Sequence, residues 1–406
     1  MNRPSGSSGV LPESRPASAA TPRVNVEFGA VLAVLLVTGW VANHFVALMP
    51  AISDRQHLST ATLDAIFGIY AVGLLPGLLL GGRASDVFGR LAVAMTGSAT
   101  AVVGTVAMLL SQEAEVLTVG RFIVGVGVGL AMSSGTAWAS DLKGPAGAAS
   151  AGAVLIVGFA IGPFVGGLIT GAGEPGVRIS FAVAAALVVA AMAVTIVVAR
   201  RPAETVAADS RDPEPAAAPQ QSIARALSWA LPMAPWVFAS ATLGFVTIPA
   251  RVQTGLAAPV AAGLAALIVN GASGVIQVVA RVGKWGPQCG TAGAVLAALS
   301  YALIAVAPPT MTVALSLPLL LILGCAAGLS LREGLIDLEA AAPQRVRGTL
   351  TGVFYSVTYI GFGLPLLLTT AGPEATQLIL AAMAVLASTA AISRTLRLRP
   401  DAHRQS

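Results

Sequence analysis

Of the 406 residues in this chain, only 10% are charged and 56% are apolar, whereas ordinary soluble domains carry about 25% charged residues. This composition excludes an ordinary soluble domain and predicts an integral membrane protein. The formal net charge of +5 is small, and a nucleic-acid partner is not needed to explain it.

The first 27 residues are rich in serine, proline and alanine and lack an apolar core, so we expect a disordered cytoplasmic tail rather than a cleaved signal peptide. Crossing about 30 Å of hydrocarbon as a helix takes about 20 mostly apolar residues. Twelve such runs follow the tail, at residues 28–49, 61–81, 91–110, 116–137, 148–170, 178–198, 233–252, 257–280, 288–308, 312–332, 349–370 and 375–393. The chain is therefore expected to be all-α, with twelve transmembrane helices.

The helices are expected to form two bundles of six. Residues 200–232 contain proline, alanine and charge without a periodic apolar face, which is typical of a linker. They separate a bundle at 28–199 from a bundle at 233–393. GLAMSSGTAW at Gly129 resembles GLSLREGLID at Gly328, which favours a duplicated architecture, although glycine-rich helices can also match by chance. Such repeats place the substrate near the bilayer midplane between the halves.

Basic residues predict the orientation of the chain. An even number of spans puts both termini on one side, and all lysines and arginines except Arg55, Arg121, Arg178 and Arg251 fall on that side. These include the basic tail at 394–406. Because cytoplasmic loops carry an excess of basic residues, we expect a multi-pass protein of the plasma membrane with both termini in the cytoplasm. This bias also accounts for the net charge.

The loop after the second run reads GGRASDVFGR and has a specific spacing of glycine, acid and base. Gly82, Asp86, Gly89 and Arg90 resemble the signature G-x-x-x-D-x-x-G-R between helices 2 and 3 of the major facilitator superfamily. The resemblance implies an inner gate in which Asp86 meets the start of helix 11, at residues 347–349. The alternative is a solvated turn that serves only the positive-inside bias.

The fifth run contains GFAIGPFVGG, which resembles the helix 5 signature G-x-x-x-G-P-x-x-G-G of the same superfamily. The matching residues are Gly158, Gly162, Pro163, Gly166 and Gly167. Proline removes a backbone hydrogen bond and allows a bend, while glycines at spacing four form a smooth face. Among relatives, this motif is associated with proton-coupled antiporters that export small molecules. The alternative is a packing face without influence on transport direction.

The fourth run contains Arg121 near its start, followed by Gly125, Gly127 and Gly129, and resembles a third motif of the superfamily, R-x-x-x-G-x-G. Arg121 lies inside the outer boundary of the hydrocarbon, where an arginine is costly unless it faces water, a carboxylate or the interface. We expect it to line the cavity and to influence a nearby proton acceptor. The alternative is an arginine that extends to the outer headgroups.

Asn43 and His44 occupy the stretch of helix 1 in which many drug–proton antiporters carry an aspartate. His44 can titrate near neutral pH and carry the coupling proton, or it can be a neutral histidine bonded to a neighbouring helix. Asp64 and Glu333 are further acidic candidates, although Glu333 falls near the inner edge of the hydrocarbon. The remaining cavity candidates are polar groups on helices 8 and 11, namely Asn270, Tyr355 and Tyr359.

Two cysteines and three histidines without ligand spacing predict no metal site and no cofactor, and the chain lacks a Walker-type loop. We therefore expect a transporter rather than an enzyme: a monomer in the bilayer that exports a small lipophilic solute by proton antiport. The scarcity of central cations argues against phosphorylated or dicarboxylate substrates. Uptake by symport or uniport, and a non-transporting receptor on the same fold, are the alternatives.

Overall fold

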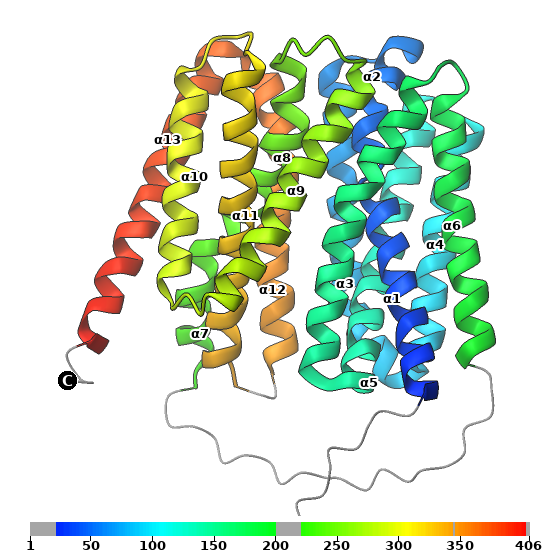
Figure 1. The fold of residues 1–406 in the computed structure, drawn as a ribbon, viewed down its shortest axis with the longest axis horizontal. Coiled ribbons are helices and arrows are strands. Elements are labelled where there is room, and N and C mark those ends of the chain that lie inside the picture. Colours follow the sequence, from blue (N-terminus) through cyan, green and yellow to red (C-terminus); the bar gives the residue numbers. More distant parts are fainter. Residues whose placement is uncertain (1–21, 200–220, 344–345, 403–406) are drawn as a thin grey trace, which may run out of the picture.

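The computed structural model describes residues 22–199, 221–343 and 346–402, and these form a bundle of helices (Figure 1). The helices before residue 200 are α1 Pro22–Asn43, α2 Phe45–Gln56, α3 Thr60–Phe88, α4 Arg90–Leu110, α5 Ala114–Gly171 and α6 Gly176–Ala199. Those after residue 220 are α7 Ile223–Ala230, η1 Leu231–Met233, α8 Ala234–Thr242, η2 Leu243–Thr247, η3 Pro249–Arg251, α9 Ala258–Val282, α10 Gln288–Val306, α11 Val313–Ala341, α12 Arg347–Tyr359, η5 Ile360–Gly363 and α13 Leu364–Ala402.

Eleven helices of the described residues are long and apolar enough to cross a bilayer. The last, Arg347–Arg399, has 53 residues, or about 80 Å of helix against about 30 Å of hydrocarbon. It is broken at Gly372, whose φ of 79° is not helical. This segment therefore has the length of two crossings. The predicted all-helical membrane fold is confirmed, and the break at Gly372 lies between the two last predicted spans.

The 58-residue helix α5 also contains two spans. Its backbone is non-helical at Lys143 and at Gly144, whose φ of 59° lies in the left-handed region that glycine adopts without steric cost. The break falls between the predicted runs 116–137 and 148–170.

Figure 1 shows α1–α6 beside α7–α13, with the start of α1, the break in α5 and the end of α13 at one end of the bundle. We call this end the base. The opposite end, which carries the end of α2 and the connection between α10 and α11, is called the top. The halves meet chiefly where α5 packs against α9, with further contacts between α2 and α9 and between α3 and α13.

Three segments are more helical than expected. Helix α1 begins at Pro22, within the predicted tail 1–27, of which residues 1–21 lie outside the described residues. In the predicted linker 200–232, residues 200–220 also lie outside, but Ser222 caps α7 by accepting a hydrogen bond from the backbone N–H of Arg225. Ala226 and Ala230, one turn apart, then pack against α11 and α12. The linker was predicted too long because this apolar face is small, consisting of Ala226, Ala230 and the partly buried Leu227.

The predicted basic tail 394–406 is helical as far as Ala402, because α13 continues past the expected end of the last span. Arg394 is only 4% exposed and is held by acidic side chains of α11. This arginine is therefore part of the packed structure, and its role is described below.

Glycines bring the backbones of α3 and α5 into close approach. A Cβ atom on Gly125 or Gly129 of α5 would collide with backbone atoms of α3, and one on Gly73 or Gly77 of α3 would collide with α5. Small residues allow such contacts between membrane helices, where packing replaces the hydrophobic effect as the main driving force. The motif that begins at Arg121 thus fixes this arginine against α3.

Candidate functional site

The loop motif forms a compact ion cluster at the base. Arg90 pairs with Asp86 at 2.6 Å and with Asp141 of α5 at 2.7 Å, and it also donates to the hydroxyl of Ser85. Gly89 has a φ of 90°, which explains the glycine at this position. The Asp86 side chain is 62% exposed, so the cluster is accessible from the base.

In this conformation the acid of the loop motif is satisfied within its own half. The expected partner at residues 347–349 is not among the contacts of Asp86 in the described residues, and Arg347 instead donates to the backbone carbonyl of Ala342. A Cβ atom on Gly82 would meet open space, so this glycine has no packing role here. The gate contact remains a prediction for a conformation in which the base is closed.

The helix 5 motif creates a free backbone acceptor between the two halves. Pro163 has no N–H, so the carbonyl of Phe159, four residues earlier, lacks its helical donor. The side-chain amide of Asn43 donates to this carbonyl at 2.9 Å, and the amide of Asn270, from the second half, donates at 3.4 Å. Two of the predicted cavity residues thus converge on one oxygen, at a point where α5 contacts α9.

Removing both amides should leave the carbonyl of Phe159 without its side-chain donors. We expect Asn43→Leu with Asn270→Leu to lower the free energy of unfolding by about 1–3 kcal/mol, because a buried acceptor without a donor keeps its full desolvation cost. Either single variant should cost less than half of this, since one donor remains. Thermal unfolding in detergent measures the effect, and strictly additive single costs would contradict a shared acceptor.

The glycines of the helix 5 motif face several neighbours, and a Cβ atom on Gly166 would meet Ser180 of α6 and Leu48 of α2. Cβ atoms on Gly158 and Gly162 would meet the backbone of α1 at Gly39 and Trp40, whereas one on Gly167 would meet Pro259 of the second half. The predicted smooth face is therefore used for close packing on both sides of α5.

A matched pair of alanine substitutions tests this packing. Gly152, on the same helix as Gly158, has nothing within 4 Å of a Cβ position. Gly152→Ala should raise the free energy of unfolding by about 0.5–1 kcal/mol through helix propensity. Gly158→Ala should lower it by about 1–3 kcal/mol through overpacking. Thermal unfolding of both variants checks the sign, and equal shifts would refute the packing role.

The first span is one continuous helix from Val24 to Gln56, and His44 lies where α1 meets α2 with helical backbone angles of φ −58° and ψ −29°. The imidazole Nδ1 contacts the carbonyl of Val41 at 3.1 Å, which fixes Nδ1 as the donor because a carbonyl only accepts. Nε2 of His44 is buried without a partner, and the ring packs edge-on against Phe181.

Arg121 lies beside the end of α1 and is completely buried. Its Nη1 donates to the carbonyl of Ala42 at 3.2 Å, and its guanidinium carbon stands 4.8 Å from the ring centre of Phe45 and 4.4 Å from that of Tyr70. The guanidinium therefore faces the protein interior and does not extend to the headgroups. We name Asn43, His44, Tyr70 and Arg121 the central polar cluster.

Aromatic rings extend the central polar cluster into the second half. Phe67 stacks on Phe362 at 4.9 Å, and Tyr70 lies 5.9 Å from the same ring. Tyr359, a predicted cavity residue, also packs on Phe362 and is 4% exposed. Tyr355 is half-buried one turn earlier on α12, where its ring contacts Phe354.

Asp64 connects the halves near the top. Its Oδ2 accepts a hydrogen bond of 2.6 Å from the hydroxyl of Thr369 on α13. The carboxyl group is 2% exposed, and its other oxygen has no hydrogen-bond partner among the described residues. Asp64 was predicted, together with Glu333, as a further acidic candidate for the proton pathway.

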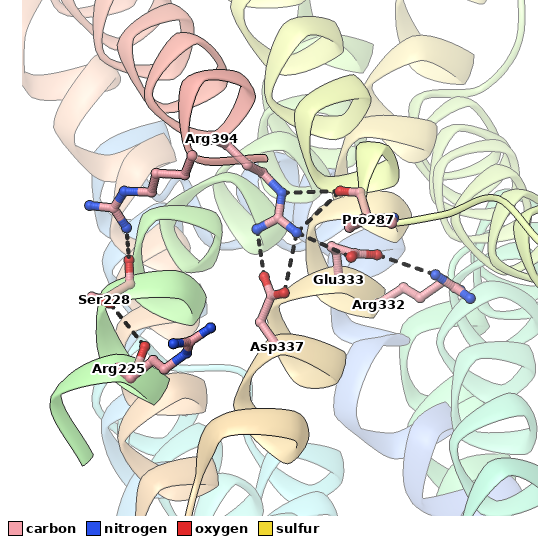
Figure 2. Close-up of polar contacts among 8 residues, drawn as sticks. Arg225, Ser228, Pro287, Arg332, Glu333, Asp337 and Arg394 are labelled. Atoms are coloured by element: carbon pink, nitrogen blue, oxygen red, sulfur yellow. Dashed lines mark hydrogen bonds and ion pairs between the residues drawn. The ribbon is translucent and has the colours of Figure 1, made fainter. Parts of the chain in front are cut away.

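Glu333 belongs to a second ion cluster at the base, together with Arg332, Asp337 and Arg394 (Figure 2). Arg394 of α13 donates to Glu333 at 3.1 Å and to Asp337 at 2.5 Å, and it also donates to the carbonyl of Pro287. Arg332 pairs with Glu333 from the other side at 3.3 Å. The charge of the Glu333 carboxylate is thus neutralised by arginines of the second half. Glu333 does not join the central polar cluster.

Tyr70, Asp141 and Arg394 are among the residues of these sites that were not singled out from the sequence. Glu333 and Asp337 are four residues apart and share one face of a helix. Burying both acids requires a cation nearby, so their spacing indicated a basic partner such as Arg394. Tyr70 gave no signal beyond being a tyrosine in a span.

Comparison with protein families decides the identity of the fold. The model of the Major Facilitator Superfamily matches residues 31–366. The chain belongs to this superfamily. It is accordingly a secondary transporter of the membrane for a small-molecule substrate, and not an enzyme.

Two kinds of relative accompany this match. The chain is 32% identical over 96 residues to the multidrug resistance protein MdtL of Shigella flexneri and 31% identical to MdtL of Escherichia coli, and each match covers 24% of either protein. The chain thus aligns with about a quarter of the length of these curated relatives.

Among solved structures, a peptide transporter POT in complex with sulfate is similar to this chain with a TM-score of 0.74 and 14% sequence identity. The match covers 92% of this chain and 94% of the POT chain. The nucleoside transporter NupG is similar with a TM-score of 0.61 and 15% sequence identity, and the match covers 92% of this chain and 98% of the NupG chain. At such identities the likeness concerns the fold.

Proposed function

We propose that this major facilitator exports a small solute in exchange for protons by alternating access. The observation that carries the proposal is the proline-freed carbonyl of Phe159, which amides of both halves share at the centre of the molecule. A bend-prone helix with donors on both sides suits two bundles that rock against each other. The match to multidrug resistance proteins over 96 residues supports the export direction.

The described contacts suit a conformation closed at the top and not fully closed at the base, where Leu79 of α3 packs against Gly352 of α12. Asp64 and Thr369 join the halves near the top, as do Gly167 and Pro259. The ion pairs that the described residues form at the base do not connect the two halves. Arg90 pairs with Asp86 and Asp141 in the first half, and Arg394 pairs with Glu333 and Asp337 in the second. A gate contact of Asp86 with α12 would then form when the base closes.

We place the base in the cytoplasm and the protein in the plasma membrane. Lysine and arginine are concentrated on base segments, at Arg83, Arg90, Lys143, Arg281, Lys284, Arg332, Arg347, Arg394, Arg397 and Arg399. The positive-inside rule favours this orientation. We further infer that the transporter acts as a monomer, in which each six-helix half supplies one moving body.

Uptake by symport or uniport is the second candidate, since the solved structures with similar folds are named peptide and nucleoside transporters. A non-transporting receptor is a third, and it would bind a solute without any flux. A receptor has no need for the base motif or for a bend-prone helix 5.

A transport assay separates these functions. Proteoliposomes that contain a pH dye receive lipophilic cations, neutral antibiotics, aromatic acids or sugars, and proton movement is recorded. We expect a solute gradient to drive protons in the opposite direction. His44→Ala and Asp64→Asn identify the coupling group, because only its loss abolishes proton movement while solute binding remains. Solute flux without proton movement would refute antiport, and co-directional movement would establish symport.

A further inference from the structure

Arg121 is a buried cation whose charge the protein does not neutralise. The side chain has no exposed surface, and none of the ion pairs of the described residues includes it. One hydrogen bond, from Nη1 to the carbonyl of Ala42, uses a part of its donor capacity. Nε and Nη2 are buried without a hydrogen-bond partner in the described part of the chain. Burying a charge in this way is costly unless an opposite charge joins it.

Among the described residues, the neighbours of Arg121 include no acid. Nε2 of His44 is an uncharged acceptor, because Nδ1 of this ring is the donor. The guanidinium stands over the ring of Tyr70, and the hydroxyl of this tyrosine is itself buried without a partner. The ring faces of Tyr70 and Phe45 attract a cation but provide no hydrogen-bond acceptor in its plane. The unpartnered N–H groups and the phenol O–H together form a site for an anion.

The site lies where a solute of a rocking transporter would sit. Counting about 1.5 Å per residue, Arg121 is about 10 Å below the start of α5 and Tyr70 about 15 Å below the start of α3, both within the span. Tyr70 contacts Phe362 of the second half, so separation of the halves at this contact would open the site. Phe45, Phe67 and Phe362 supply apolar surface beside it.

Resting on the proposed export function, we propose that Arg121 and Tyr70 bind the anionic group of the solute, which is a lipophilic monoanion such as an aromatic carboxylate. The guanidinium offers Nε and Nη2 to the two carboxylate oxygens, and the phenol donates to one of them. A single cation suits a solute with a single negative charge. This agrees with the prediction from the sequence that the substrate is not a dicarboxylate. The aromatic rings bind the body of the solute.

Isothermal titration calorimetry of the full-length protein in detergent at pH 7 tests the proposal with three probes of equal shape. These are 2-naphthoate, neutral 2-naphthamide and cationic 2-naphthylmethylamine. We expect the carboxylate to bind about tenfold or more tightly than the amide, because charged hydrogen bonds are stronger than neutral ones. Arg121→Gln should abolish this preference and leave amide binding unchanged.

Two further variants keep the result interpretable. Tyr70→Phe retains the ring and should reduce the preference for the carboxylate by about threefold or more. It serves as the second test if Arg121→Gln fails to fold. Arg178→Gln, at an exposed arginine of α6, is the matched control and should bind like the wild type. Equal or tighter binding of the amide or the amine, no carboxylate binding to the wild type, or a preference that survives both variants would overturn the proposal.

The outcome is distinguishable from a failure of the export proposal. Equilibrium binding requires neither protons nor flux, so selective carboxylate binding supports the site even in a uniporter. Conversely, proton exchange driven by a neutral or cationic solute, with no carboxylate binding, would retain the transport function and refute the anion site.

Discussion

Replacing Arg394 with glutamine should destabilise the second half more than any other single change considered for this protein. The guanidinium holds Glu333 and Asp337 at the base, and its side chain is 3% exposed. Removing one partner of a buried ion pair leaves uncompensated charge, which costs about 3–5 kcal/mol. We expect a clear drop in the thermal unfolding temperature in detergent.

The matched control is Arg397→Gln, three residues further along α13. Both Arg394 and Arg397 stand over the ring of Trp229. Arg397 is exposed, however, and donates only to the backbone carbonyl of Ser228. Its loss should cost less than about 1 kcal/mol. Combining Arg394→Gln with Glu333→Gln and Asp337→Asn should restore part of the stability, because the cation and both acids are then absent together. Equal unfolding temperatures for both arginine variants would contradict the cluster.

Replacing Asp86 with asparagine should impair transport and leave the fold largely intact. Its pair with Arg90 is exposed, and Arg90 keeps its second partner, Asp141, so the stability cost should stay below about 1 kcal/mol. The proposed gate contact with α12 forms only in the base-closed state. Losing it shifts the equilibrium between the two states by an expected 1–3 kcal/mol, or about five- to 150-fold.

The initial rate of solute-driven proton movement in proteoliposomes measures this effect, with Asp54→Asn at the top of the bundle as control. Asp54 is exposed and outside the motif, so its variant should transport like the wild type. Wild-type rates for Asp86→Asn would refute the gate. A large fall in unfolding temperature would show instead that the acid is structural.

Much of the fold follows from the sequence because the bilayer allows few solutions. Apolar runs of about 20 residues must be helices, and the length of each run fixes one crossing. Gly144 and Gly372, which separate adjacent spans, stand at points where the apolar runs also end. Capping side chains and small apolar faces carry a weaker signal, which is why α7 fell within the predicted linker.

The site is less predictable, because side-chain partners come from distant segments. The proline of the helix 5 motif indicated a free carbonyl, but only the fold brings Asn43 and Asn270 to it. In the same way, the base-side position of Glu333 was suggested by counting residues, whereas its partner Arg394 had been assigned to a tail. Local patterns predict chemistry along one helix, and contacts between helices depend on rotation and depth.

Alternating access is the central claim, and pulsed electron-paramagnetic-resonance distances test it most directly. Spin labels at Phe88 and Thr349 report on the base, and labels at Thr60 and Glu374 report on the top, in a cysteine-free background. We predict a long base distance and a short top distance without solute, and a second population with the reverse pattern when solute or pH changes. One unchanged distance distribution at both ends under all conditions would contradict the account.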